Sequence, residues 1–218
     1  MFPESLRRVF VDRVEYLAGQ ALPVSNGTEP ILHVLVSGCV TLVNRIGMTS
    51  AVFWPGDLIV APVERAGAAM ILKAVAETVC LRASLADLMT ECGRHQDGAL
   101  WVWQQQERRE IELHRRLELL SAESVERRVL LTVADLADRA KTTRPDSPMP
   151  LAQNEVAELA GATRETTSTL LNRMRRLGMV ELGRRRIHVV DSDTLRTLQG
   201  LTEMEPATPA MAIGAAAN

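Results

Sequence analysis

The chain has 218 residues, 46% of them hydrophobic, and its 25 basic and 27 acidic side chains leave a net charge of −2. This length suits one medium domain with a smaller one, and no apolar run approaches the roughly 20 residues that span a membrane. The three cysteines lie far apart, which excludes a disulfide framework, and the N-terminus lacks the apolar core of a signal peptide. We therefore expect a soluble, cytoplasmic protein without a membrane partner.

The first part of the chain predicts a β-rich domain. Residues 1–18 suggest a short helical lead. From Gly19 onward, short apolar runs alternate with turns that contain glycine or proline; the runs are 31–36, 39–43, 49–53, 58–60, 69–72 and 78–82. Many short strands with such turns predict an antiparallel barrel or sandwich.

Residues 97–120 predict one long helix. Several of its apolar residues follow the 3–4 spacing that suits pairing with a second helix, namely Ala99, Trp103, Leu113, Leu117 and Leu120. Gln106 and Glu110 interrupt this spacing. A solvated helix that packs only on its own barrel therefore stays an alternative.

A hinge and a further helix follow. Residues 121–124 break the long helix, and Ser124 would cap a helix over residues 124–140. The buried stripe of that helix would comprise Val125, Val129, Leu130, Val133 and Leu136. Residues 141–150 are rich in proline and predict a loop, whereas residues 201–218 consist largely of small residues with prolines and predict a disordered tail.

Residues 153–177 predict a helix-turn-helix. The first helix, 153–160, carries its apolar residues on one face, and residues 161–162 form a turn of the length that sets two helices at a steep angle. Thr163 is a favourable N-cap for the second helix. Glu165 lies in the first turn of that helix, where the helix dipole favours a negative charge.

The second helix has two chemically different sides. Its buried stripe would comprise Thr167, Leu170, Leu171, Met174 and Leu177. The opposite side carries groups suited to base edges, namely Arg164, Glu165, Ser168, Thr169 and Asn172. An ordinary helical hairpin with a solvated polar face is the alternative interpretation.

A basic β-hairpin follows this helix directly. Strand patterns at 179–182 and 186–190 are joined by Gly183, Arg184 and Arg185. Seven arginines against two glutamates give residues 164–186 a net charge of about +5, although the whole chain is at −2. This concentration predicts a winged helix that contacts phosphates, with a solvated charged face as the alternative.

Residues 151–190 resemble the C-terminal domain of the Crp/Fnr family of transcription regulators. The family pattern is roughly T-Q-x-x-x-A-x-x-x-G-x-S-R-E-T-x-x-R, followed by Leu-Gly-Ile at the start of the wing. The matching positions here are Ala152-Gln153, Ala157, Gly161, Thr163-Arg164-Glu165-Thr166 and Leu177-Gly178-Met179. Ala152 departs from the usual capping Thr or Ser, and Thr169 stands where many members have a base-reading Arg. The target half-site therefore need not be the commonest one of the family.

The order of β-rich domain, long helix and winged helix extends the resemblance over nearly the whole chain, with less specific marks at 35–42 and 55–57. The resemblance implies an α+β fold. Its parts would be an antiparallel β-roll or jelly-roll sensor domain with a cyclic-nucleotide-binding-like fold (1–96), a long dimerisation helix (97–120), a winged helix-turn-helix domain (121–200) and the tail (201–218).

The same resemblance implies a homodimer that regulates transcription on double-stranded DNA, with RNA polymerase as a further partner. The residues expected to face the major groove are Arg164, Glu165, Ser168, Thr169 and Asn172. The expected phosphate contacts are Thr163, Arg173, Arg175, Arg176, Arg184, Arg185 and Arg186.

The sequence of the barrel bears on which effector it can hold. Family barrels often hold a cyclic nucleotide on a Gly-Glu pair and an Arg-Ser/Thr-Ala motif, but Val60-Ala61 and residues 68–70 stand at these positions. Arg65 and Lys73 are nearby cations outside the motif. A buried phosphate without a paired cation is costly, so we expect no cyclic AMP. Because no cysteine precedes Cys39, we expect no N-terminal iron–sulfur cluster and no metal site.

Haem or thiol sensing stays open as an alternative. A haem ligand could come from three isolated histidines, for which a structural or surface role is simpler: His33, His95 and His114. Cys39 and Cys80 lie in strand patterns and suggest buried packing. Cys92 has cations beside it that could lower its pKa and make it a redox sensor. A barrel that is empty or holds an apolar ligand is equally open.

Two alternative functions belong to other classes of protein. In one, a ligand or haem sensor uses its helix-turn-helix to contact a protein rather than DNA. In the other, the barrel holds an enzyme site, but the sequence has no clustered His, Asp and Glu, no nucleophile elbow and no phosphate-cradling glycine loop. We therefore expect a protein without catalytic activity.

Overall fold

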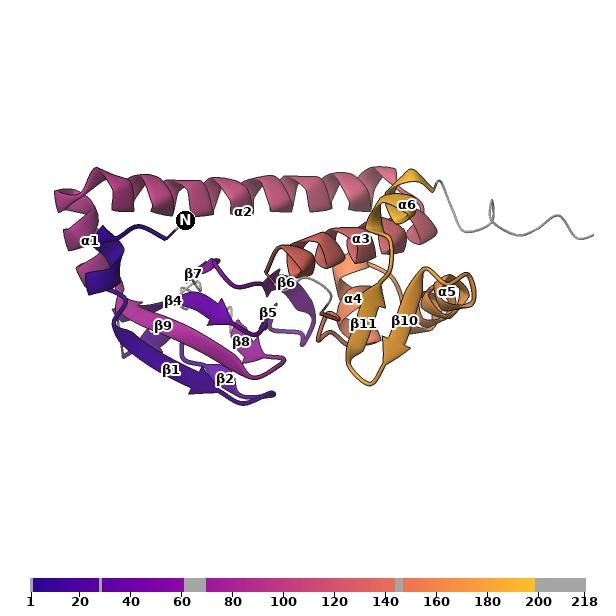
Figure 1. Cartoon of the computed structure of the whole chain (residues 1–218), viewed down its shortest axis with the longest axis horizontal. Helices are drawn as coiled ribbons and strands as arrows, with labels where there is room; N and C mark the ends of the chain where they lie inside the picture. Colours follow the sequence, from indigo (N-terminus) through magenta and orange to yellow (C-terminus); the bar gives the residue numbers. More distant parts are fainter. Residues whose placement is uncertain (1, 28, 61–69, 144–146, 199–218) are drawn as a thin grey trace, which may run out of the picture.

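The computed structural model describes residues 2–27, 29–60, 70–143 and 147–198. A β-sheet domain lies at one end of the molecule and a helical domain with a small hairpin lies at the other (Figure 1). The long helix α2 (Gln96–Ala122) runs along both. Within the described residues, no helix is both long and apolar enough to cross a membrane.

The N-terminal segment departs from its prediction. A short 3-10 helix covers only Ser5–Arg8, and the chain then enters strand β1 (Asp12–Tyr16). This strand pairs antiparallel with β9 (Thr78–Ser84), from Asp12 opposite Arg82 to Tyr16 opposite Thr78. The predicted helical lead over 1–18 is therefore wrong beyond the first turn. Pairing with a distant strand overrode the local preference.

Two antiparallel sheets build the N-terminal domain, which confirms the predicted β-roll. In the first sheet the order is β1, β9, β4 (Glu29–Ser37) and β3 (Ser25–Asn26), and β7 (Leu58–Val60) also pairs with β4. In the second sheet the order is β2 (Ala21–Leu22), β8 (Ile71–Ala74), β5 (Val40–Val43) and β6 (Thr49–Phe53). Residues from both sheets share one buried core, which includes Leu35, Val40, Ile59, Leu72 and Cys80.

Two helices connect this domain to the rest of the chain. The first, α1 (Leu85–Arg94), begins at Ser84, whose hydroxyl accepts a hydrogen bond from the Asp87 amide at 3.0 Å. Helix α2 follows after His95 and extends the predicted span of 97–120 by one residue at its start and two at its end. Its Gln105 side chain is buried and accepts a hydrogen bond from the Leu58 amide at 3.3 Å, which fixes the helix against the sheet.

Helix α3 (Val125–Thr143) begins where the sequence predicted, because the Ser124 hydroxyl accepts a hydrogen bond from the Arg127 amide at 3.2 Å. The break between α2 and α3 is narrower than predicted, since α2 continues through Ala122. Val125 is exposed, contrary to the predicted buried stripe, because it lies at the very start of the helix. The remaining stripe residues are buried, namely Val129, Leu130, Val133 and Leu136.

The C-terminal part contains α4 (Gln153–Ala160), α5 (Arg164–Arg176), β10 (Val180–Gly183), β11 (Arg186–Val189) and α6 (Ser192–Thr197). Residues of α3 to α6 and the hairpin bury one apolar core. Met149 extends the hairpin, because it exchanges two backbone hydrogen bonds with Ile187 at 2.8 and 3.1 Å. The order of β domain, long helix and winged helix-turn-helix confirms the predicted α+β architecture.

The two ends of the molecule are packed together. Cys39, Val52, Trp54 and Val75 of the β domain belong to the same buried cluster as the helical domain. At the edge of this contact, a Glu158 side-chain oxygen accepts a hydrogen bond from the Thr49 amide at 2.7 Å. The β domain and α4 are therefore held in one defined arrangement by apolar packing and by polar contacts.

Candidate nucleic-acid interface

A tight turn sets the angle between α4 and α5. Gly161 ends α4 in the left-handed conformation, with φ of 60° and ψ of 40°. A Cβ at this position would lie 2.5 Å from Cδ2 of Leu120, so a side chain here would have to displace the end of the Leu120 side chain of α2. Both demands explain the glycine that the sequence pattern places at this turn.

The second helix begins as the sequence predicted. The Thr163 hydroxyl accepts a hydrogen bond from the Thr166 amide at 3.1 Å and caps α5. Glu165 lies in the first turn, where its charge interacts favourably with the helix dipole. The cap fixes the point at which the exposed residues of α5 begin.

The start of α4 has only half of the usual capping arrangement. Ala152 occupies the N-cap position and has no oxygen with which to accept a hydrogen bond. Glu155 supplies the other half, because its carboxylate accepts a hydrogen bond from the Ala152 amide at 2.6 Å. The same carboxylate forms an ion pair with Arg185 of the hairpin at 2.8 Å. One acidic group thus connects the start of α4 to the tip of the wing.

Helix α5 separates its apolar and polar residues across two sides. Thr167, Leu170, Leu171 and Met174 are buried, but Leu177 is exposed, contrary to the predicted stripe. Leu177 is the C-cap residue, at the end of the predicted stripe, and 37% of its surface is exposed there.

The predicted base-reading residues lie on the outward side of α5. Arg164, Glu165 and Thr169 are exposed. Ser168 and Asn172 are half-buried, and the Asn172 amide donates a hydrogen bond to the Ser168 carbonyl at 2.8 Å. The exposed surface therefore offers a guanidinium, a carboxylate and a hydroxyl in the first turns of the helix, with two further polar groups behind them.

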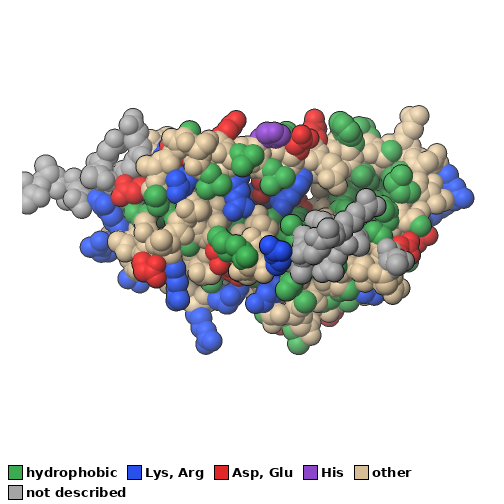
Figure 2. Space-filling view, turned by 180° about the vertical axis from the view of Figure 1, so that it is seen from behind, with side chains coloured by type: hydrophobic (Ala, Val, Ile, Leu, Met, Phe, Trp, Pro, Cys, Tyr) green, Lys and Arg blue, Asp and Glu red, His purple; other side chains and the backbone are tan. Residues whose placement is uncertain are grey.

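The predicted phosphate-binding arginines differ in their surroundings. Arg175 and Arg176 are exposed at the C-terminal end of α5, where the dipole favours cations, whereas Arg173 is half-buried. Figure 2 shows basic side chains gathered over the half of the molecule that contains the helix-turn-helix.

The wing is a β-hairpin with a two-residue turn. Gly183 pairs with Arg186, so Arg184 and Arg185 alone form its turn. Gly183 therefore ends β10 and does not occupy the turn, as the sequence had suggested, and the positive φ of 51° falls on Arg185. A non-glycine residue in this region is strained, and the ion pair with Glu155 helps to hold it there. Arg184 and Arg186 are exposed beside it.

The three histidines considered as haem ligands differ in their exposure. His33 is buried, its Nε2 lies 2.7 Å from the Pro23 carbonyl oxygen, and burial lowers its pKa. His95 and His114 are exposed on or beside α2. Within the described residues, no group of three or more His, Cys, Asp or Glu side chains is placed to hold a metal ion.

Burial raises the pKa of all three cysteines. Burial raises the pKa of Cys92, and the nearby carboxylates of Glu91 and Asp97 raise it further. The prediction that neighbouring cations lower this pKa is wrong, because burial and these two carboxylates act in the opposite direction. Cys39 and Cys80 are buried, as predicted from their strands, and burial raises the pKa of Cys80 to about 12.

The structure describes only some of the positions at which family members carry the cyclic-nucleotide motif. Val60 ends β7 and is exposed. Ala61, Arg65 and residues 68–69 lie outside the described residues, as do residues 201–218 with the predicted tail. The expectation that the barrel does not bind cyclic AMP therefore stays a prediction.

Comparisons with known proteins found a family match in the C-terminal part of the chain and similar solved structures over most of its length. The Crp-like helix-turn-helix domain family matches residues 111–198. FixK2 from Bradyrhizobium japonicum superposes with a TM-score of 0.67 at 19% identity, covering 84% of this chain and 94% of that chain. A CooA mutant from Carboxydothermus hydrogenoformans has a TM-score of 0.66 at 18% identity, covering 87% and 88%.

A third solved structure has a similar fold. TTHB099, a transcriptional regulator of the CRP family from Thermus thermophilus, has a TM-score of 0.64 at 19% identity, covering 84% of this chain and 94% of that chain. At such identities the likeness shows a shared fold. The comparison with curated proteins found no match.

Proposed function

Residues 111–198 form a Crp-like helix-turn-helix domain within a chain that has the fold of Crp/Fnr regulators, and on this premise we propose a homodimeric, sequence-specific DNA-binding transcription regulator without catalytic activity. The observation that carries the proposal is the exposed side of α5, which begins at a capped N-terminus with Arg164, Glu165 and Thr169. A helix with this start has the shape and the groups to enter a major groove.

In the proposed complex, α5 reads the bases. An arginine can donate two hydrogen bonds to O6 and N7 of guanine, and a glutamate can accept one from the amino group of cytosine. Arg164 and Glu165 are adjacent and exposed, so they suit neighbouring base pairs. Thr169, Ser168 and Asn172 lie further along the same side and complete the proposed reading surface.

The proposed phosphate contacts surround this helix. They come from the N-cap hydroxyl, the end of α5 and the wing, namely Thr163, Arg173, Arg175, Arg176, Arg184, Arg185 and Arg186. Arg185 differs from the others because it already pairs with Glu155. A phosphate would have to compete with that carboxylate, so we assign Arg185 a weaker contribution than Arg184 or Arg186.

We propose that a second copy of the chain pairs along α2. Apolar side chains at heptad-like spacing are exposed on this helix, among them Trp103, Leu113, Leu117 and Leu120. Leaving such a row in water is unfavourable, and a helix from a second copy would cover it. A twofold axis there would present two α5 helices to half-sites about 34–36 Å apart.

The parts of the chain then have separate proposed roles. Residues 1–96 act as the sensor domain, 97–120 as the dimerisation helix and 121–200 as the DNA-binding domain. RNA polymerase is a further proposed partner, because a regulator of this kind acts on transcription. The contact between α4 and β6 offers a route by which the first part can affect the third.

The experiment is a fluorescence-anisotropy titration of the protein with fragments of its own genome at low and moderate salt. We expect selected fragments to bind with an affinity that falls steeply as salt rises. Arg164→Ala should weaken binding of the tightest-binding fragment by about 1–3 kcal/mol and reduce the difference in affinity between fragments.

Arg94→Ala is the matched control, because Arg94 is an exposed arginine at the end of α1, away from the interface. This variant should bind like the parent protein. An absence of binding at low salt, or an Arg164→Ala variant with unchanged selectivity, would refute the proposal.

A further inference from the structure

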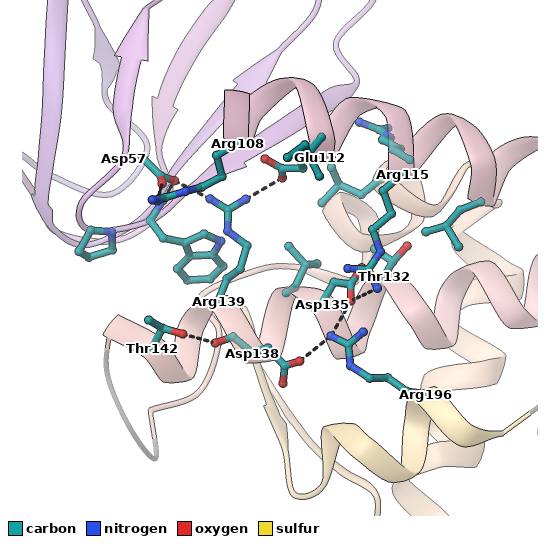
Figure 3. A pocket seen from close by; sticks show the side chains of 17 residues that line it. Asp57, Arg108, Glu112, Arg115, Thr132, Asp135, Asp138, Arg139, Thr142 and Arg196 are labelled. Atoms are coloured by element: carbon teal, nitrogen blue, oxygen red, sulfur yellow. Dashed lines mark hydrogen bonds and ion pairs between the residues drawn. The ribbon is translucent and has the colours of Figure 1, made fainter. Parts of the chain in front are cut away.

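A cavity of about 500 Å³ lies where the β domain, α2, α3 and α6 meet (Figure 3). This volume is within the range of sites that bind small molecules. Its apolar lining consists of Trp54, Pro55, Ile111, Leu119, Leu136 and Leu159. Val60 and Met70, the described residues at the family's cyclic-nucleotide motif positions, do not line it.

Charged side chains cross the cavity in two connected groups (Figure 3). In the first, Arg139 pairs with both Asp57 and Glu112 at 2.6 Å. In the second, Asp135 pairs with Arg115 at 3.2 Å and with Arg196 at 2.6 Å. The groups join the turn before β7 to three helices, so the cavity has walls that are held in place by ion pairs.

Among the ion-paired residues that line the cavity, the two most exposed side chains are arginines. The side chains of Arg108 and Arg115 are 63% and 51% exposed, whereas those of their partners Asp57 and Asp135 are only 12% and 25% exposed. Arg108 is also loosely held, because its closest contact with Asp57 is 4.0 Å. The carboxylates of Glu112 and Asp138 in the lining are 39% and 40% exposed, so the guanidinium groups of Arg108 and Arg115 are more exposed than these carboxylates.

One buried polar group in the lining has no protein partner. Trp54 is 4% exposed, and its indole Nε1 has no hydrogen-bond partner among the described residues. Buried donors are nearly always paired, because an unpaired donor has lost its hydration without compensation. Because this nitrogen is itself buried, a molecule in the cavity would contact the other atoms of the indole ring, which lines it.

We propose that this cavity binds a small organic anion with an apolar body. Its anionic group, a carboxylate, sulfonate or phosphate, pairs with Arg108 and Arg115. Its apolar body lies against Trp54 and the leucines of α3 and α4. Such a molecule would contact the β domain and the helical domain at once, and would stabilise the arrangement in which both are joined.

Pairing of two copies along α2 leaves this cavity accessible. Ile111 lines the cavity, and Leu113 belongs to the exposed apolar row on the same helix. Two residues along an α-helix correspond to a rotation of about 200°. The cavity and the proposed dimer contact therefore use different sides of α2, and the inference does not depend on DNA binding.

The test uses 8-anilinonaphthalene-1-sulfonate, an aromatic sulfonate whose fluorescence rises in apolar surroundings, titrated into the full chain. We expect one saturable site per chain. Arg108→Gln should reduce the affinity of this site for the probe about tenfold, which is the loss expected for one charge-assisted hydrogen bond. Ile111→Asp should also reduce the affinity for the probe at least tenfold, because the substitution places a negative charge at the opening of the cavity. Arg94→Gln, outside the cavity, is the matched control and should bind like the parent protein.

The position of the probe is read from the indole N–H signals in a proton–nitrogen NMR spectrum. The signal of Trp54, identified by its loss in Trp54→Phe, should shift on binding, while those of Trp101 and Trp103 should not. Ile111 is 62% exposed, so its substitution preserves the fold and keeps the test valid if Arg108→Gln is unstable.

Three results would overturn the proposal. The first is equal affinity in the parent, Arg108→Gln and Ile111→Asp proteins. The second is a shift of the Trp103 signal in place of Trp54, which would locate the probe on the apolar row of α2. The third is equally tight binding of the uncharged analogue N-phenyl-1-naphthylamine, which would remove the role of the anionic group.

Discussion

Replacing Gly161 by alanine should destabilise the protein by about 2–3 kcal/mol, through two separable effects. The left-handed conformation at this residue costs a non-glycine residue about 1–2 kcal/mol. The added Cβ would also lie 2.5 Å from Cδ2 of Leu120. Because that atom is the end of a flexible and exposed side chain, we assign the clash about 1 kcal/mol, the lower end for overpacking.

Gly178 provides a matched control. It also has a positive φ, of 74°, but a Cβ there would have no neighbour within 4 Å. Gly178→Ala should therefore show the conformational cost alone, about 1–2 kcal/mol. The difference between the two variants isolates the contact between the end of α2 and the turn of the helix-turn-helix.

The assay is urea unfolding of both glycine variants with and without Leu120→Ala, at one protein concentration because self-association affects apparent stability. Leu120→Ala should relieve the clash in Gly161→Ala and give a coupling energy of about 1 kcal/mol, with no coupling to Gly178→Ala. Additive effects in both pairs would refute the reasoning, since they would show that α2 does not contact this turn.

Three further predictions concern the wing, the dimer and the response to pH. Glu155→Gln should release Arg185 while keeping an acceptor for the Ala152 amide, so it should tighten DNA binding at low salt and steepen the salt dependence by about one phosphate contact. Leu117→Glu should place charges opposite each other in the proposed dimer and yield monomers in analytical ultracentrifugation. For His33, burial lowers the folded-state pKa below the ordinary value of 6.5, so unfolding takes up a proton as pH falls. The free energy of unfolding should therefore decrease as pH drops below about 6.5, and His33→Gln should flatten that part of the profile.

Each of these predictions has a result that contradicts it. Unchanged salt dependence in Glu155→Gln would mean that Arg185 does not reach phosphate. A dimeric Leu117→Glu protein would place the contact between copies elsewhere. If the free energies of unfolding of the parent and His33→Gln proteins change in parallel from about pH 7 to about pH 5, His33 is excluded as the titrating group.

The sequence alone predicted the elements whose signals are local. Thr163 accepts a hydrogen bond from an amide three residues away, and Ser124 caps α3 in the same way. The side of α5 that carries Arg164 and Glu165 follows from a repeat of 3.6 residues per turn, which a short stretch already contains. These contacts involve neighbours along the chain, so one sequence was sufficient to find them.

Predictions failed where the deciding partner lies far away or where an element ends. Residues 12–16 form a strand because residues 78–82 pair with them, and no local pattern contains that information. Leu177 matched the helical period, yet α5 had already ended at Arg176. For Cys92, the sequence showed cations beside it, whereas the folded arrangement and burial raise its pKa.

Only the tertiary structure decided which distant residues meet. Arg185 pairs with Glu155 across 30 positions, and Asp57 meets Arg139 across 82, so neither pairing was visible as a motif. The cavity likewise gathers its walls from the β domain, α2, α3, α4 and α6. Local hydrogen bonds and periodicity determine the helices and the exposed polar side of α5, whereas long-range packing determines which charges are paired, which groups are buried and which residues line the cavity.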